Sequence, residues 1–509
     1  MQTLNTENSI GAGFWARLRG DWPRVWPLLA LGLVLRILFV AAGAKIYYAG
    51  RQMDMYTNGD SYSYALSFQN LLHYGRYTFD LTEPDAAVGR LPGYPFFYGL
   101  HYLIFGPKHV LLATACTQAV LDTLGIWLVY SITARLAGER SWAPLLAALL
   151  LATYPFSIVW TTITGTETLG LFLVLLWWAV LILARPKTTN WLVLGALLAL
   201  IIYVREFLGL CLAVTLFCLL LRTWTPQAGI ARWRPITWVM AGFLLLYIWW
   251  PVRNYLTLAR FIPLKPAAAG YANLREDAQE SLAWMLTWTN DVTAGTEELL
   301  NAPNPSFPAD VISTPAEHQL IDSLVVLSRT CASSFHVRMK PAVIAPGPDG
   351  ALTDSMRYYS AQLGNTLHYH NCNMVVSNGF RRLRASYLQR HPVQGRVEVP
   401  LQNFRKIIFK SQLKAEGGPQ NTTQRLITLL FAWRSLLLVL GLVGAWKFRR
   451  KVDLWPAILF AGGIFCFMAI VFRSMEMRYL LQADVLMLVP AALFLAHWLP
   501  QRPASPATV

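Results

Sequence analysis

Charged residues are scarce in this sequence. Of its 509 residues only 14% are Asp, Glu, Lys or Arg, whereas 55% are hydrophobic, and the mean hydropathy is +0.40. A soluble protein would have about 25% charged residues. The apolar residues form long continuous blocks that can cross the hydrocarbon layer of about 30 Å as helices. The composition excludes a soluble enzyme and a disordered chain, and blocks without alternation exclude an outer-membrane barrel.

Paired cysteines and nucleotide-binding motifs are also missing. None of the six cysteines belongs to a CxxC pair, so they indicate no zinc site. The chain has no Walker loop, no GxGxxG, HExxH or GxSxG motif and no internal repeat. These absences argue against an ATP-driven pump, and the missing repeat argues against a transporter built from inverted repeats.

The net charge of +16 would suit a nucleic-acid-binding protein, but the placement of the basic residues does not. Lys and Arg lie mainly at the ends of apolar blocks and in the stretch from Arg381 to Lys414. The positive-inside bias and the phosphates of lipid headgroups account for both positions. We therefore expect membrane lipids, and no nucleic acid, as partners.

The apolar blocks predict an all-α polytopic membrane protein with about ten transmembrane helices. Two further helices, at 62–74 and 92–106, are predicted to be interfacial or re-entrant, because they are too short or too polar to cross. A large, mostly α-helical extracytoplasmic loop domain completes the fold. The expected spans are 26–47, 109–135, 142–160, 167–184, 190–204, 206–222, 235–254, 426–446, 453–473 and 478–498.

The predicted organisation has four parts. Residues 1–255 form an N-terminal transmembrane catalytic module with its first outside loop at 48–108, and 256–425 form the loop domain. Residues 426–499 form the C-terminal transmembrane helices, and 500–509 are a cytoplasmic tail. The Lys and Arg distribution places both termini in the cytoplasm. We expect a multi-pass protein of the cell (inner) membrane whose active site faces the periplasm or exterior.

The stretch 188–222 is predicted to be two helices. As one helix it would run roughly 50 Å, far more than the membrane needs. Arg205 and Glu206 at its middle would each cost about 2.5–3.5 kcal/mol at the bilayer centre. Two short helices that meet at this pair avoid that cost.

The predicted topology collects ionisable residues on the outer side. Such residues at membrane depth are functional candidates by default, and arginine binds phosphate bidentately. The set therefore suits a lipid-linked phosphate. Other roles stay open: Asp60 as a helix cap, Glu167 as an acid favoured at a helix N-terminus, and Arg205 with Glu206 as a buried pair. The set is Asp60, Arg90, Glu167, Arg205, Glu206, Arg253, Arg473, Glu476 and Arg478.

Several short motifs in this set resemble a known superfamily. They are Gly59-Asp60-Ser61, Arg90-Leu91-Pro92-Gly93-Tyr94, Phe105-Gly106, Thr166-Glu167-Thr168, Arg205-Glu206, Pro251-Val252-Arg253-Asn254 and Arg478-Tyr479. In this order and on this side of the membrane they resemble the glycosyltransferase C superfamily. The branch they resemble most contains dolichyl-phosphate-mannose–protein mannosyltransferases and lipid A aminoarabinose transferases. The likeness covers residues 15–275 and 425–498.

This resemblance implies an inverting membrane glycosyltransferase. It would move a hexosyl or pentosyl group from a polyprenyl-phosphate donor to an extracytoplasmic acceptor, which is a glycan, a lipid or a protein. Asp60 would be the carboxylate that acts as base or positions the acceptor, and we expect it to be the catalytic base. One carboxylate suffices because the phosphate leaves already ionised, unlike the leaving group in glycoside hydrolysis. Because guanidinium groups match phosphate, we expect Arg90, Arg205, Arg253 and Arg478 to bind the donor phosphate. Supporting roles are expected for Tyr94, Glu167, Glu206, Asn254 and Tyr479.

The chain departs from the family pattern at two places. Ser61 follows Asp60 where relatives often have an Asp-Glu pair, and Arg90-Leu-Pro replaces a Lys-Pro-Pro element. The sequence assigns no cofactor and no metal ligands, although a divalent metal ion stays open. Two other functions also stay open: an undecaprenyl-diphosphate glycan ligase or polymerase, and a non-enzymatic lipid-linked-sugar transporter.

Two cysteines lie in the large loop, and the other four lie in apolar blocks. Cys331 and Cys372 are predicted to be outside the cytoplasm, where disulfides persist. We expect a disulfide between them, which requires Cα atoms within about 7 Å. The alternative is two unrelated free thiols.

Overall fold

The computed structural model describes most of the chain. The described residues are 2–49, 54–81, 84–138, 141–184, 186–223, 233–266, 276–289, 295, 298–299, 302, 304–330, 371–409, 422–473 and 476–500.

The described residues form helices and no strand, as the sequence predicts. Seven helices are long and apolar enough to cross a membrane, and a pair bent by 46° within 143–161 makes eight. Two shorter apolar helices follow between residues 188 and 221. The protein is an all-helical polytopic membrane protein, whereas the number of ten crossings stays a prediction. The bundle consists of α1 (Gln2–Leu38), α2 (Ala44–Ala49), α4 (Gly93–Leu136), α5 (Ala143–Ala152), α6 (Pro155–Ile158), α7 (Thr166–Leu183), α8 (Thr188–Val204), α9 (Leu210–Thr223), α10 (Arg234–Tyr247), α11 (Trp249–Leu258), α19 (Thr422–Lys447), α20 (Trp455–Cys466) and α21 (Met477–Ala496).

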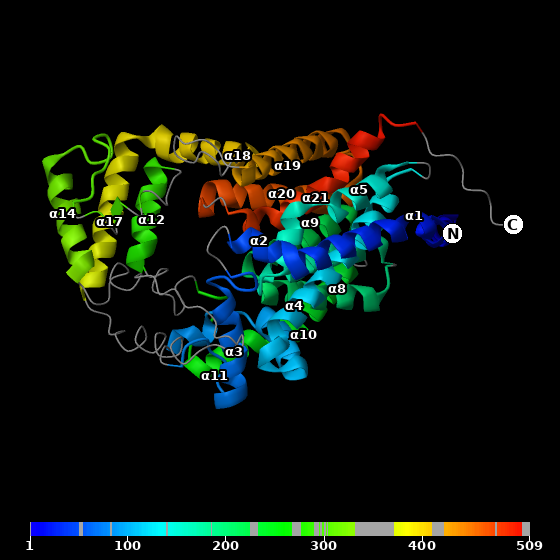
Figure 1. Ribbon diagram of the computed structural model, residues 1–509, viewed down its shortest axis with the longest axis horizontal. Coiled ribbons are helices and arrows are strands. Elements are labelled where there is room, and N and C mark those ends of the chain that lie inside the picture. The colour runs from blue at the N-terminus through cyan, green and yellow to red at the C-terminus, as the bar shows by residue number, and fades with distance from the viewer. Residues whose placement is uncertain are drawn as a thin grey trace.

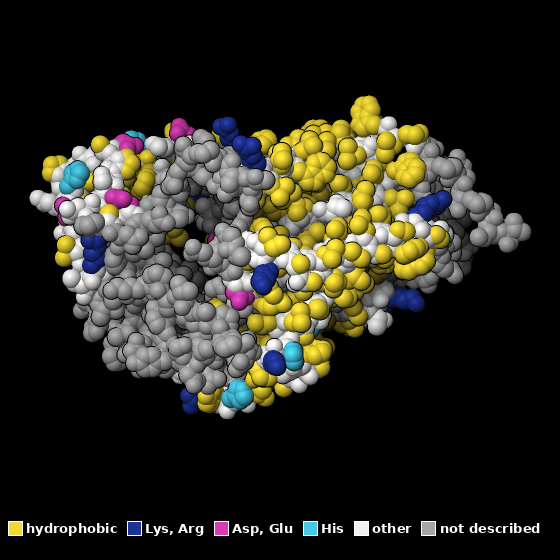
Figure 2. Space-filling view, viewed as in Figure 1, with side chains coloured by type: hydrophobic (Ala, Val, Ile, Leu, Met, Phe, Trp, Pro, Cys, Tyr) yellow, Lys and Arg dark blue, Asp and Glu magenta, His cyan; other side chains and the backbone are white. Residues whose placement is uncertain are grey.

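The bundle has central and peripheral helices. Within the membrane-spanning windows, 78% of α21 and 72% of α7 are buried inside the protein, compared with 22% of the first span and 28% of α19. Apolar side chains cover the face of the bundle seen in Figure 2, as expected where helices meet lipid. The helix α21 packs against α5, α7, α19 and α20, so its first turn is held firmly at one end of the bundle.

Small residues allow the closest helix contacts. A Cβ atom added at Gly444 of α19 would lie 2.1 Å from the carbonyl oxygen of Pro490 in α21. A Cβ atom added at Gly195 of α8 would lie 2.0 Å from the carbonyl oxygen of Val239 in α10. Only glycine permits such an approach of two backbones, and small residues at interfaces are typical of membrane helices.

The helix predicted at 62–74 is present as α3 (Ser61–Tyr74), and the loop continues through a 3₁₀ turn, η2 (Pro84–Val88). The stretch predicted at 92–106 forms the first part of α4. Gly106 interrupts this helix with a left-handed φ of +71° and ψ of 172°, and Pro107 follows it. The helical break at the predicted position is therefore confirmed, whereas the orientation of both helices to the membrane stays a prediction.

The predicted break within 188–222 is also confirmed. The helix α8 ends at Val204, and Arg205 has extended backbone, with φ −158° and ψ 125°. A 3₁₀ turn, η4 (Glu206–Gly209), leads into α9. The break leaves Arg205 and Glu206 at helix ends rather than inside a continuous span, which avoids the cost of two charges within a helix surrounded by lipid.

In the described part of the chain, three helices outside the bundle pack around a separate core. They are α12 (Glu276–Trp288), α14 (Pro315–Thr330) and α17 (Asn371–Arg390), and Trp284, Ile321 and Phe380 are buried between them. Figure 1 shows this group at the end of the molecule far from the start of α1. A π turn, η7 (Gln394–Glu398), and α18 (Val399–Phe409) connect it to the bundle. The limits 256–425 of the loop domain stay a prediction.

Cys372, near the start of α17, is disulfide-bonded. Its predicted partner, Cys331, lies outside the described residues, so the pairing stays a prediction. The four cysteines in the apolar blocks are not disulfide-bonded.

Two ion pairs inside the bundle were missed by the sequence reasoning. Arg36 of α1 pairs with Asp122 of α4 at 2.6 Å, and Arg434 of α19 pairs with Asp484 of α21 at 2.6 Å. All four side chains are at most 2% exposed. Each of these four residues is a single charged residue inside an apolar block of the sequence. Such residues are rare in membrane helices and are usually paired, so their positions could have indicated these ion pairs.

Candidate functional site

Asp60 immediately precedes α3, where a capping side chain is expected. Instead, the Asn58 Oδ1 atom accepts hydrogen bonds from the backbone N–H groups of Asp60 at 3.0 Å and of Ser61 at 3.2 Å. The Asp60 carboxylate makes no capping hydrogen bond. The capping alternative is thus wrong for this side chain, which is available for other contacts.

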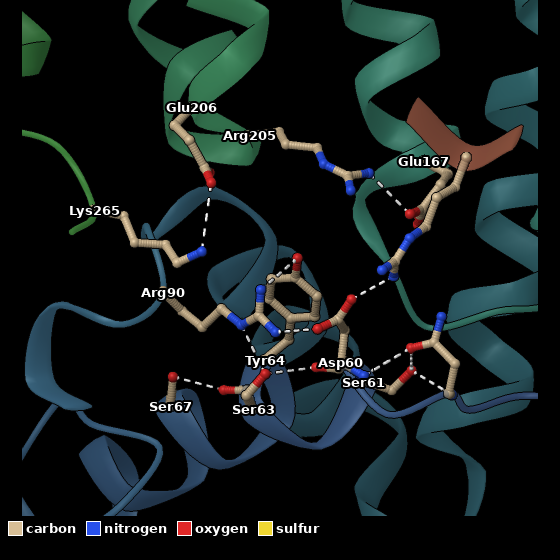
Figure 3. A network of polar contacts seen from close by, with 12 residues as sticks. Asp60, Ser61, Ser63, Tyr64, Ser67, Arg90, Glu167, Arg205, Glu206 and Lys265 are labelled. Atoms are coloured by element: carbon tan, nitrogen blue, oxygen red, sulfur yellow. Dashed lines mark hydrogen bonds and ion pairs between the residues drawn. The ribbon is translucent and has the colours of Figure 1, made fainter. Parts of the chain in front are cut away.

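The carboxylate of Asp60 lies between two guanidinium groups. Arg90 Nη2 is 2.7 Å from Asp60 Oδ1, and Arg478 Nη1 is 2.5 Å from Oδ2. Arg90 follows η2 in the first outside loop, whereas Arg478 is in the first turn of α21, 418 residues after Asp60. The fold therefore brings together three of the predicted site residues from distant parts of the chain (Figure 3).

Residues of α3 fix the guanidinium of Arg90. Its Nε donates to Ser63 Oγ at 2.7 Å and its Nη1 donates to the Tyr64 hydroxyl at 3.1 Å. The guanidinium carbon also lies 4.1 Å from the centre of the Tyr64 ring, a cation–π contact. Tyr94 lies beneath this layer: its ring packs edge-on against Tyr64, and its hydroxyl donates to Gln118 at 2.9 Å.

The two arginines determine the charge state of Asp60. Burial disfavours its ionised form, but the guanidiniums of Arg90 and Arg478 outweigh this effect and hold the pKa of the carboxyl well below its usual range. Asp60 is therefore a carboxylate at neutral pH. While both arginines stay in contact with it, it is a weak base.

Glu167 and Arg205 form a second, deeper pair. Arg205 Nη1 donates to Glu167 Oε1 at 2.8 Å, and the two side chains are 9% and 4% exposed. The Arg205 guanidinium also contacts the face of Tyr479 at 4.6 Å, and Arg478 contacts the same ring at 4.9 Å. Arg205 thus pairs with Glu167 at the start of α7 rather than with its neighbour Glu206, so the buried Arg205–Glu206 pair is wrong.

Glu206 pairs instead with Lys265, which the sequence reasoning did not select. Lys265 Nζ is 3.4 Å from Glu206 Oε1. Burial lowers the pKa of this lysine, Glu206 opposes the shift, and the nearby Arg90 reinforces it. Figure 3 shows this pair and the Glu167–Arg205 pair around the Asp60–Arg90 contact. A lysine just beyond an outward helix end, against the positive-inside bias, was the signal that could have found it.

Two predicted site residues have other contacts. Arg253 donates to the carbonyl oxygens of Ala87 at 2.7 Å and Tyr77 at 2.8 Å. Asn254 accepts a hydrogen bond from Arg253 and donates to the carbonyl oxygen of Ile262 at 2.8 Å. Both side chains therefore hold the first outside loop and the segment after α11 in place, and the structure does not join them to the cluster around Asp60.

Glu476 and Arg473 also lie near the start of α21. Glu476 is half-exposed and lies 2.6 Å from Arg478 Nε. Arg473, which lies beyond the end of α20, donates to the carbonyl oxygens of Leu286 at 2.6 Å and Gly395 at 3.3 Å, and so joins this segment to α12 and η7.

The described residues contain no group of three or more His, Cys, Asp or Glu side chains arranged to hold a metal ion. Asp60 has a guanidinium nitrogen on each of its two oxygens. Two positive charges at this distance repel a divalent cation, so Asp60 is a poor metal ligand in this arrangement.

Comparison with known protein families gives a match to part of the chain. The family model described as dolichyl-phosphate-mannose-protein mannosyltransferase matches residues 86–254, a range that includes Arg90, Glu167 and Arg205. No curated protein sequence matches the chain significantly.

Two solved structures are similar at low identity. The archaeal oligosaccharyltransferase AglB from Archaeoglobus fulgidus, solved with an inhibitory peptide and a dolichol-phosphate, is 14% identical with a TM-score of 0.45. The match covers 93% of this chain but only 50% of AglB, so this chain spans half of that protein's length. ArnT from Cupriavidus metallidurans bound to undecaprenyl phosphate is 15% identical, with a TM-score of 0.34. The match covers 90% of this chain and 77% of ArnT.

At these similarities neither structure assigns a function to this chain. The family match lies within residues 15–275, where the motifs were found. The predicted resemblance to the branch that contains dolichyl-phosphate-mannose–protein mannosyltransferases is thereby confirmed for residues 86–254.

Proposed function

We propose that the protein transfers a sugar from a polyprenyl-phosphate donor to a hydroxyl group of an acceptor on the extracytoplasmic side. One observation carries this proposal: a single carboxylate, Asp60, lies between two guanidiniums at 2.7 and 2.5 Å at the ends of membrane helices. Guanidinium groups bind phosphate in the same bidentate manner as carboxylate. The arrangement thus supplies a base and a phosphate site within one cluster.

The donor phosphate and Asp60 would compete for the same two arginines. When Arg90 and Arg478 turn to the phosphate, Asp60 loses the positive charges that depress its pKa. Its pKa then rises toward the usual value and the carboxylate becomes a better base. Binding of the donor would in this way activate the base only when the leaving group is in place.

The chemical step is a displacement at the anomeric carbon. Asp60 takes the proton of the acceptor hydroxyl, and the acceptor oxygen forms the new bond from the face opposite to the phosphate. The bond between the anomeric carbon and the phosphate oxygen breaks, and the phosphate leaves with the electron pair. Configuration is inverted. Arg90 and Arg478 stabilise the charge that the phosphate gains, the largest kind of contribution in such sites.

The other site residues support this cluster. The Glu167–Arg205 pair holds Tyr479, whose ring Arg478 also contacts, and thereby fixes the position of Arg478. The hydrogen bonds of Arg253 and Asn254 support a structural role in shaping the first outside loop, in place of donor phosphate binding.

The test is the substitution Asp60→Asn, assayed for transfer from a polyprenyl-phosphate sugar in proteoliposomes. A positioned base contributes about 10²–10⁴ in rate, so we expect a loss of this size. Asn fits the same space, so the variant should still fold, although it loses the two ion pairs of Asp60 and should unfold at a lower temperature than wild type. Wild-type transfer by a correctly folded variant would refute the proposal, and transport of the lipid-linked sugar without any transfer would favour the transporter.

A further inference from the structure

The Glu206–Lys265 pair differs from the other ion pairs of the cluster. Its nitrogen–oxygen distance is 3.4 Å, whereas the other four pairs are between 2.5 and 2.8 Å. The side chain of Lys265 is 13% exposed and that of Glu206 is 39% exposed. The lysine is therefore enclosed by the protein while its carboxylate partner already faces solvent.

We propose that Lys265 is a further donor-phosphate-binding residue and that Glu206 is the counter-ion that the phosphate displaces. This inference rests on the proposed function, because it assigns a third cation to the same phosphate. It also gives Glu206 a specific role: it neutralises Lys265 before the donor binds, and it competes with the donor for that lysine.

The positions of the charges support this assignment. Lys265 is close enough to Asp60 and Arg90 for their charges to act on it, and Glu206 also feels the charge of Arg90. The lysine ammonium thus belongs to the same electrostatic cluster as the arginines that contact Asp60. Figure 3 shows Lys265 and Arg90 on the same side of the cluster.

The charge balance explains why a carboxylate must be displaced. Among the described residues, the ion pairs of the cluster join four cationic side chains to four carboxylates, so the charges of these eight side chains balance before a phosphate arrives; they are Arg90, Arg205, Arg478 and Lys265, and Asp60, Glu167, Glu206 and Glu476. The phosphodiester donor carries one negative charge, and the departing phosphate monoester carries about two at neutral pH. Glu206 can turn into solvent at little cost because its contact is the longest and its side chain is well exposed.

The experiment measures binding of undecaprenyl phosphate to the full chain in nanodiscs of zwitterionic lipid. We expect Lys265→Ala to weaken binding about tenfold, since hydrogen bonds between charged groups contribute this much, and Lys265→Arg to retain binding within about threefold. Glu206→Gln should tighten binding about threefold or more, because it removes the competing carboxylate. In the Lys265→Ala background Glu206→Gln should change nothing. Lys451→Ala, a lysine in the loop before α20, is the matched control and should bind as wild type.

The opposite signs of the two single substitutions distinguish binding from a structural role. If the pair only holds the fold, Lys265→Ala and Glu206→Gln would both weaken binding, and that result would overturn the inference. Equal affinity of Lys265→Ala and wild type would also overturn it. Undecaprenol, which lacks the phosphate, should bind all variants alike. If wild type does not bind undecaprenyl phosphate, the proposed function itself fails; if Arg478→Ala alone loses binding, only the role of Lys265 fails.

Discussion

Ion pairs occur both in the interior of the helix bundle and in the cluster around Asp60, but the surroundings of the two groups of ion pairs differ. Arg36 donates not only to Asp122 but also to the carbonyl oxygens of Gly32, Leu151 and Ala152, and every atom of the pair is shielded from solvent. In the cluster around Asp60, the side chains of Asp60, Glu206 and Glu476 are 35%, 39% and 50% exposed. A saturated pair has no capacity for a ligand, whereas a partly solvated carboxylate can be exchanged for one.

This contrast separates structural from functional charges better than burial alone. Arg434 and Asp484 make two parallel hydrogen bonds of 2.6 and 2.8 Å, and Arg434 also donates to the carbonyl oxygen of Ile407. The pair therefore joins α18, α19 and α21 beneath the first turn of α21. We infer that the ion pairs in the bundle interior set the position of the helices and that the ion pairs of the cluster around Asp60 bind substrate.

The largest expected effect is on stability, from breaking an interior pair. Asp484→Ala leaves Arg434 buried without its carboxylate, which costs about 3–5 kcal/mol. The double variant Arg434→Met with Asp484→Leu removes both charges and should recover most of this loss. Thermal unfolding in detergent measures both variants. If Asp484→Ala is as stable as wild type, the Arg434–Asp484 pair does not stabilise the bundle, and the distinction between structural and substrate-binding ion pairs fails.

A smaller effect is expected from Arg253→Ala, which tests the boundary between the two classes. The substitution removes hydrogen bonds to the carbonyl oxygens of Tyr77 and Ala87, so we expect a loss of stability of about 1–3 kcal/mol. Binding of undecaprenyl phosphate should change less than about threefold once the protein is folded. Arg478→Ala should show the reverse pattern, with little loss of stability and a loss of binding that Arg478→Lys only partly restores. A loss of binding in Arg253→Ala as large as that in Arg478→Ala would return Arg253 to the phosphate site.

The smallest effect concerns pH. The pKa of Asp60 is lower in the folded protein than in the unfolded chain, so its contribution to stability is fully present above about pH 4, the usual value for Asp. The contribution is lost as the pH falls from there toward the folded pKa. Asp60→Asn should therefore flatten the acid side of the profile of unfolding temperature against pH, and it should lower the unfolding temperature in the neutral range, where the contribution of the charged Asp60 is fully present. Identical acid profiles for the variant and wild type would show that the two arginines do not hold Asp60 in solution.

The helices were predictable from the sequence because hydropathy and chain breaks are local properties. The break at Arg205 and the interruption at Gly106 follow from a charged pair and from a Gly-Pro step within otherwise apolar stretches. The helix after Asp60 was likewise predicted, although the residue that caps it is Asn58. The same pattern grouped Asp60, Arg90 and Arg478 in one predicted set, and the structure brings these three side chains into contact.

The pairing of the charges could not be predicted in this way. Arg205 and Glu206 are neighbours in the chain, yet the extended backbone at Arg205 separates their side chains toward Glu167 and Lys265. Arg253 matched a motif of the resembled family, but the fold places backbone carbonyl oxygens within its reach.

The sequence by itself determined a helical membrane protein with ionisable residues near the ends of its apolar segments, because the cost of placing charges in lipid acts on each segment separately. Only the tertiary structure decided which of these charges meet. Asp60 and Arg478 are 418 residues apart, and Coulomb attraction between them acts only after α3 and α21 have packed into the same bundle. The energy of an ion pair depends on the distance between the two charged groups in space, and the number of residues between them in the sequence does not give this distance.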